Sequence, residues 1–297
     1  MSMKQDAFAG YHPAVNLFYF ALVIGCAMVL AHPVCLAFSL ACAMGYAVSL
    51  SGKKALRLYM LPLLLATAIA NPLFSHAGVT ILAYLPSGNP LTLESILYGI
   101  WAAFLLVTVI TWFSCFNAVM RSDKLVYLFG RVIPALSLVL SMALRFVPRF
   151  TAQAKAIANA QKCLGRDVSQ GNILRRAKHG MKILSILITW ALENAIDTAD
   201  SMKSRGYGLP GRSAFSLYRF ERRDRLALLF LAVCGSLIFA GAVTGQLEFH
   251  FYPYIGGADC SAWQAGLFVI YIALGGLPLW VRGREALQWK RASRAGA

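Results

Sequence analysis

The chain has 297 residues, of which 59% are hydrophobic and only 13% charged, and its mean hydropathy is +0.62. Soluble domains carry about a quarter charged residues, so this composition excludes an ordinary soluble protein. Apolar runs long enough to cross lipid recur along the chain and predict a polytopic membrane protein. We therefore expect an all-α membrane helical bundle.

The net charge of +16 is unevenly distributed. Roughly two-thirds of the Lys and Arg residues lie between Arg121 and Arg225, whereas residues 72–93 and 245–262 contain none. This contrast predicts that the basic stretch is cytoplasmic and that the bare loops face outward. Because membrane topology already explains the charge, no nucleic-acid partner is expected.

Six spans satisfy this charge rule and place both termini in the cytoplasm, as in a multi-pass protein of the cell (inner, cytoplasmic) membrane. In chain order they cover residues 15–31, 34–50, 58–70, 93–116, 226–244 and 263–281, followed by a basic tail, 282–297. In the long outer loop after the third span, residues 79–85 are apolar enough for a short strand or a re-entrant segment.

The middle third of the chain differs from the rest. The apolar run 132–144 falls short of the roughly 20 residues needed to span lipid, and residues 145–149 end it. An alanine-rich helix then covers 151–164, and a long helix with a polar end stops at Ser204. We expect three parts: an N-terminal bundle of about four spans (1–120), a cytoplasmic helical region (121–225), and a C-terminal hairpin with its tail (226–297).

The sequence offers little for catalysis. The five histidines are scattered, and the seven cysteines, with no Cys-x-x-Cys pair, are expected to be structural and reduced. Residues 47–54 resemble a phosphate loop, but Lys54 stands where a magnesium-binding hydroxyl is required. We therefore expect no metal, no cofactor and no enzymatic activity. The scarcity of charges within the spans, with Glu94 at one edge, also disfavours a self-sufficient carrier.

The string Ser204-Arg205-Gly206 ends the polar helix. It fits an ordinary helix terminus, in which Gly supplies a left-handed cap and Arg complements the negative end of the dipole. It also fits a docking point for a soluble partner, because a capped end can still present its arginine.

Four segments resemble one family, the transmembrane T component of energy-coupling factor transporters, which is related to the cobalt-transport membrane subunit. They are residues 71–76 with the loop that follows, 143–148, 160–167 and 199–208. The resemblance implies two long cytoplasmic coupling helices that end in arginine-centred motifs. Those motifs dock into two ATP-binding-cassette ATPase subunits, while the chain holds a small membrane S component that binds a vitamin or a metal ion.

The resemblance assigns ATPase docking to Ser204, Arg205 and Gly206. The first motif departs from the family pattern, because Leu164 occupies the position of its arginine. Lys162 and Arg166 flank that position, and either can supply the charge beside Gly165.

The implied function is that of a scaffold and coupling subunit in an ATP-driven importer for a vitamin or a metal ion. A stand-alone secondary carrier or channel is the alternative, and an integral-membrane enzyme is a second one. Sequence does not identify the substrate, because in this family the S component selects it.

Overall fold

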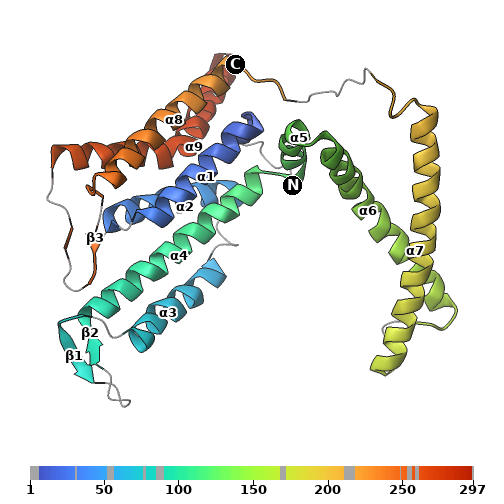
Figure 1. Cartoon of the computed structure of the whole chain (residues 1–297), viewed down its shortest axis with the longest axis horizontal. Coiled ribbons are helices and arrows are strands. Elements are labelled where there is room, and N and C mark those ends of the chain that lie inside the picture. The colour runs from blue at the N-terminus through green and yellow to red at the C-terminus, as the bar shows by residue number, and fades with distance from the viewer. Residues whose placement is uncertain are drawn as a thin grey trace. The chain divides into compact units, whose positions relative to one another are not determined.

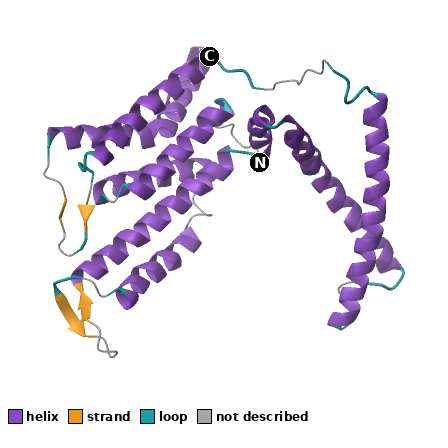
Figure 2. Cartoon of the chain, viewed as in Figure 1, coloured by secondary structure: helices purple, strands orange, loops and turns teal. Residues whose placement is uncertain are grey.

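The computed structural model of the chain describes residues 7–30, 32–51, 57–75, 78–84, 90–167, 172–210, 218–247, 249–252, 256–257 and 261–295. The chain forms two compact units. One comprises Met1–Arg121 with Tyr218–Ala297, and the other comprises Ser122–Leu217. Helices dominate both units, as Figure 2 shows. The expected all-α membrane bundle is therefore confirmed.

The first unit contains six α-helices and two small antiparallel sheets among its described residues. The helices are α1 (Pro13–Val29), α2 (Pro33–Ser51), α3 (Arg57–Phe74), α4 (Leu93–Val119), α8 (Arg222–Val243) and α9 (Ala262–Ala295), preceded by the short 3-10 helix η1 (Phe8–Gly10). One sheet pairs β1 (Ile81–Tyr84) with β2 (Pro90–Thr92), and the other pairs β3 (Phe249–His250) with β4 (Gly256–Gly257).

Helix α4 packs against α1, α2 and α3, while α9 packs against α2 and α8 (Figure 1). Aromatic side chains fill the centre: Phe8, Tyr19, Phe20 and Trp112 are each at most 1% exposed. Phe8 and Tyr19 meet edge to face, with ring centroids 5.0 Å apart. Such aromatic pairs add to the stabilisation that burial of apolar area provides.

The polar atoms of these buried rings have partners. Trp112 Nε1 donates to Ser39 Oγ at 3.0 Å, and the Tyr19 hydroxyl donates to the Gly275 carbonyl at 3.2 Å. A buried donor without an acceptor costs free energy, so these bonds favour one arrangement of α1, α2, α4 and α9.

Four helices are long and apolar enough to cross a membrane, at Pro33–Leu50, Leu93–Val119, Arg222–Val243 and Ala262–Trp289. The other two predicted spans coincide with shorter apolar helices, Pro13–Val29 and Pro62–Phe74.

A short strand or a re-entrant segment was expected in the outer loop, and the structure has a strand, β1, which ends at Tyr84; Leu85 lies outside the described residues. Glu94, at the start of α4, is 3% exposed and accepts hydrogen bonds from the Thr80 hydroxyl and, at 3.3 Å, from the Thr80 amide. Thr92 caps the same helix by accepting from the Ser95 amide at 3.3 Å. The Glu94 carboxylate therefore fastens the loop to α4.

One predicted boundary in this unit was wrong, because helix α3 continues through Asn71 and Pro72 to Phe74, where a loop was expected. Helix α9 extends beyond the sixth predicted span and through the basic tail to Ala295. Straight-chain and alanine residues, including Arg284, Glu285 and Ala286, keep that tail helical, because they are strong helix formers.

The second unit consists of α5 (Ser122–Val132), α6 (Pro134–Cys163) and α7 (Ile173–Ser204). Pro134 stands in the first turn of α6, a position where proline costs no hydrogen bond. Helices α6 and α7 cross each other (Figure 1).

The predicted start of this helix at residue 151 was wrong, because α6 begins at Pro134 and runs through Pro148 without interruption. An interior proline removes one helical hydrogen bond and ordinarily kinks or ends a helix. Here the rings of Phe146 and Phe150 stack across the proline with centroids 5.7 Å apart, and Phe150 also packs on Trp190 of α7. This packing holds together the turns before and after Pro148.

Gly99 tests the contact between α3 and α4. A Cβ at this position would lie 2.9 Å from the Ala68 carbonyl oxygen and 3.1 Å from Asn71 Cβ. We expect Gly99→Ala to destabilise the bundle by about 1–3 kcal/mol, because overpacking against backbone cannot be relieved by a rotamer change. Thermal unfolding of the purified chain in mild detergent measures this loss.

The matched control is Gly276→Ala in α9, where nothing lies within 4 Å of the added Cβ. Alanine improves helix propensity, so the melting temperature of this control is expected to hold or rise. Equal melting temperatures for both variants would contradict the close approach of α3 and α4.

Candidate functional site

The crossing of α6 and α7 is built on aromatic contacts. Phe150 and Trp190 meet edge to face at 5.7 Å between centroids, and the Arg149 guanidinium lies 5.4 Å from the centre of the Trp190 ring. The described side chains of Ser122–Leu217 include only two buried ones, Lys124 and Ile157. The unit therefore has a very small core: α5 packs on α6, and the aromatic crossing joins α6 to α7.

Helix α7 has no buried side chain along its described length. Its apolar side chains recur every fourth residue and remain exposed: Leu184 (48%), Ile188 (51%), Leu192 (61%) and Ile196 (64%). Residues four apart lie on one face of a helix, so they form a continuous apolar stripe. We call it the α7 stripe.

Helix α6 ends in a glycine-capped turn. Gly165 has φ +73°, its amide donates to the Lys162 carbonyl at 3.0 Å, and the Arg166 amide donates to the Gln161 carbonyl at 2.9 Å. This pair of bonds is the Schellman arrangement, which satisfies the last carbonyls of a helix. The predicted end of this helix just before Gly165 is confirmed.

Helix α7 ends in the same arrangement. Gly206 has φ +77°, its amide donates to the Lys203 carbonyl at 3.0 Å, and the Tyr207 amide donates to the Met202 carbonyl at 3.0 Å. The Ser204 hydroxyl donates to the Ser201 carbonyl at 2.9 Å. Ser204, Arg205 and Gly206 thus form the last turn and cap of α7.

Aligning the two turns on their glycines relates their residues one to one. Leu164 and Arg205 are both the residue before the glycine, and Lys162 matches Lys203. Arg166 follows its glycine, where α7 has Tyr207. The first turn therefore carries its arginine two positions later than the second.

The basic side chains at these ends differ in how they are engaged. Lys162 Nζ lies 3.5 Å from Asp167 Oδ2, in an ion pair whose lysine side chain is 66% exposed. Arg166 and Arg205 are exposed, and within the described part of the chain neither forms an ion pair. Their guanidinium groups can meet an acidic partner without first breaking a salt bridge.

The capped turn by itself is not specific to these helices. Helix α8 ends in one as well: Gly245 has φ +73°, and the Gln246 amide donates to the Gly241 carbonyl at 3.2 Å. That end is covered, because Gln264 Nε2 donates to the Gln246 carbonyl at 2.9 Å and Leu247 is 4% exposed. Exposure distinguishes the ends of α6 and α7.

Sequence reasoning missed two features of this region. One is Lys203, which becomes the partner of Lys162 only when the helices are aligned on their terminal glycines. The other is the α7 stripe, whose four-residue spacing is visible in the sequence but whose exposure depends on how α6 packs.

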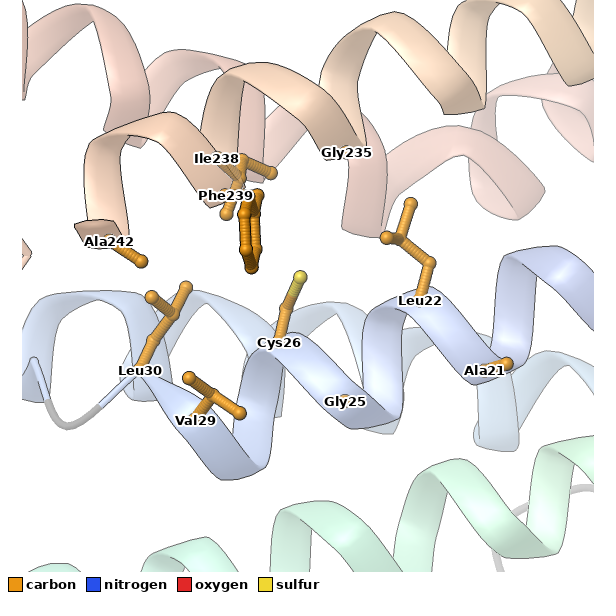
Figure 3. Close-up of a pocket in the computed structure, with 10 residues that line it drawn as sticks. All are labelled: Ala21, Leu22, Gly25, Cys26, Val29, Leu30, Gly235, Ile238, Phe239 and Ala242. Atoms are coloured by element: carbon orange, nitrogen blue, oxygen red, sulfur yellow. The ribbon is translucent and has the colours of Figure 1, made fainter.

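A pocket with a volume of about 230 Å³ lies between α1 and α8 (Figure 3). Its wall includes Gly25, Cys26, Gly235 and Phe239, and the Cys26 thiol is the only polar side-chain group in its lining. Within the described part of the chain, no group of three or more His, Cys, Asp or Glu side chains is placed to hold a metal ion. This pocket suits an apolar occupant.

The fold and the two exposed helix ends define a polytopic helical membrane protein with a separate pair of long helices. The chain belongs to the cobalt transport protein family, CbiQ, whose family model matches residues 11–216.

Curated relatives carry the description "Energy-coupling factor transporter transmembrane protein EcfT". The protein of Lactobacillus helveticus is 36% identical over 104 residues, which is 35% of this chain and 38% of the relative. That of Listeria innocua is 37% identical over 105 residues, 35% of this chain and 40% of the relative. The aligned regions thus span about two-fifths of these relatives.

Gly206 tests the capped end of α7. We expect Gly206→Ala to destabilise the last turn by about 1–2 kcal/mol, because a residue with a Cβ is strained at this positive φ. The added Cβ would also lie 3.1 Å from Leu209 Cδ1. Hydrogen exchange at the amides of Gly206 and Tyr207 should accelerate about five- to thirty-fold, the rate equivalent of that free energy.

The control is Gly180→Ala within α7, where nothing lies within 4 Å of the new Cβ and faster exchange is not expected. Gly206→Asn should retain most of the protection, since asparagine tolerates the left-handed region. Unchanged exchange in Gly206→Ala would show that the Schellman turn does not form.

Proposed function

We propose that this chain is the transmembrane coupling subunit of an ATP-driven importer of the energy-coupling factor type. Residues 122–217 act as its coupling region, and the ends of α6 and α7 bind a pair of ATP-binding-cassette ATPase subunits. One observation carries the proposal: both long helices end in exposed, glycine-capped turns that present arginine. Membership of the CbiQ family supports it.

Arginine suits such a junction. Its guanidinium presents five donors in a rigid planar fork, which can bind a carboxylate in two places. Arginine is also enriched among the residues that dominate protein interfaces. In this proposal Arg205 enters a groove on one ATPase, and the capped turn fixes the direction in which the arginine leaves the helix.

The α7 stripe supplies a second surface. A row of exposed apolar side chains at helical spacing fits the face of another helix. We assign it to the small membrane S component that binds the substrate, a vitamin or a metal ion. Arg205 lies nine residues beyond Ile196, so one helix would link the two partners mechanically.

In this proposal the chain performs no catalysis of its own, and ATP hydrolysis belongs to the ATPase subunits. The protein resides in the cell membrane with both termini on the cytoplasmic side, as the arginine- and lysine-free outer loops favour. Substrate identity then depends on the S component.

The first test concerns Arg205. We expect Arg205→Ala to weaken binding of the ATPase pair by about 2 kcal/mol, or roughly thirty-fold in Kd, the range of an interface hot spot. Co-purification of the ATPases with tagged chain from native membranes, followed by mass spectrometry, gives the readout.

Arg175→Ala is the matched control, because Arg175 is an exposed arginine at the opposite end of α7. It should leave the ATPases bound. Full ATPase recovery with Arg205→Ala would refute the docking role. Substrate flux by the chain alone in liposomes would instead favour a stand-alone carrier.

The second test separates the two basic residues of the first motif. We expect Arg166→Ala to reduce ATPase recovery and Lys162→Ala to have the smaller effect, because Lys162 is already paired with Asp167. Leu164→Arg, which restores arginine before the glycine, should compensate for Arg166→Ala. A larger loss with Lys162→Ala would reverse this assignment.

A further inference from the structure

The outward face of α8 is apolar over several turns. One face of the helix is buried in the bundle and includes Asp224, Leu231 and Cys234. Another face leaves Leu226 69% exposed, Leu229 62% exposed and Val233 49% exposed. These three residues follow the spacing i, i+3, i+7, so they form one continuous stripe along a predicted membrane span.

Two arginines begin this stripe. Arg222 lies four positions before Leu226 and Arg225 lies four positions before Leu229, so both are on the side of the helix that carries the stripe. Both are exposed, and neither forms an ion pair among the described residues. The stripe therefore has a cationic end followed by an apolar length.

The charged side chains next to these two arginines, Arg223 and Asp224, already bind other groups of the chain. Arg223 lies 3.0 Å from the Glu221 carboxylate, donates to the Gly10 carbonyl at 3.1 Å and covers the Tyr11 ring. Asp224 is 1% exposed and accepts from the amides of Glu221 and His12. Two arginine charges thus remain uncompensated near a helix N-terminus, where positive charge is unfavourable.

Two side chains of α9 indicate independently at which level of the bilayer these arginines lie. The first turns of α8 and the end of α9 lie at the same end of the bundle (Figure 1). In the C-terminal half of α9 the Arg284 guanidinium lies 4.7 Å from the centre of the Trp280 ring, and Trp280 is 61% exposed. Exposed tryptophan beside arginine is typical of the headgroup level of a bilayer.

We propose that Arg222 and Arg225 bind the phosphate of an anionic phospholipid whose acyl chain lies along Leu226, Leu229 and Val233. A guanidinium fork matches phosphate oxygens in two places, and the apolar stripe accepts a hydrocarbon chain. Two other ligands share only part of this chemistry and serve as comparisons. A zwitterionic lipid has the same acyl chain without net negative charge, and a free phosphate ion has the negative charge without the acyl chain.

The test is native mass spectrometry of the full chain, purified in mild detergent and titrated with dioleoyl phosphatidylglycerol or dioleoyl phosphatidylcholine. We expect at least five-fold preference for phosphatidylglycerol, which the R222Q/R225Q variant should lose. R175Q/R176Q removes the same charge from α7 and should keep the preference. Equal binding of both lipids to the wild-type chain, or unchanged preference in R222Q/R225Q, would overturn the site.

Two further binding measurements identify which part of the lipid is recognised. Inorganic phosphate at the lipid's concentration is expected not to displace it; displacement would leave only a free-anion site. L226S/L229S should weaken phosphatidylglycerol binding, and unchanged binding would remove the acyl chain from the proposal. Loss of ATPase recovery by R222Q/R225Q with intact lipid binding would assign the arginines to an acidic protein surface instead.

Folding of the variants is verified by size-exclusion profile and melting temperature without added lipid. Should the double variant fail to fold, R225Q alone carries the test, because Arg225 lies outside the capping contacts of Glu221 and Asp224. It should lose a measurable part of the preference, and full retention would count against the site.

Discussion

Backbone amides and carbonyls that enter lipid must find their hydrogen-bond partners within the chain, and this constraint makes the membrane spans helical. Every helix, in lipid or in water, then leaves several groups at its ends without partners within the helix. Gly165 and Gly206 resolve this locally by turning two amides back onto the last carbonyls. Because the backbone satisfies itself there, the neighbouring side chains remain available to a partner.

The two units are stabilised in different ways. The bundle has an aromatic centre around Trp112, whose indole nitrogen is bonded to Ser39, and such packing favours one arrangement. The unit Ser122–Leu217 has only two buried side chains among those described, and its crossing depends on Phe150 and Trp190. A unit with so little core leaves apolar side chains, such as those of the α7 stripe, exposed for the partners proposed above. This matches the proposed role of a coupling region that moves with the ATPases.

The same backbone turn has different consequences at different helix ends. In α8, Gly245 caps an end that Gln264 and Leu247 enclose, so the turn is purely structural. In α7, Gly206 caps an end that leaves Arg205 open. A docking role therefore rests on the surroundings of the motif, since the motif's geometry serves both purposes.

The sequence by itself determined the fold class, most span positions and the glycine-ended helices, because hydrophobic run length and glycine's access to positive φ are local properties. It also located Leu164 in the position that Arg205 occupies in the other turn. Tertiary structure decided that α6 passes through Pro148, since the Phe146, Phe150 and Trp190 contacts outweigh a local breaking signal. It likewise decided that the α7 stripe is exposed. Exposure depends on which segments meet in space, and no local pattern encodes that, whereas the Lys162–Asp167 pair forms within one short turn.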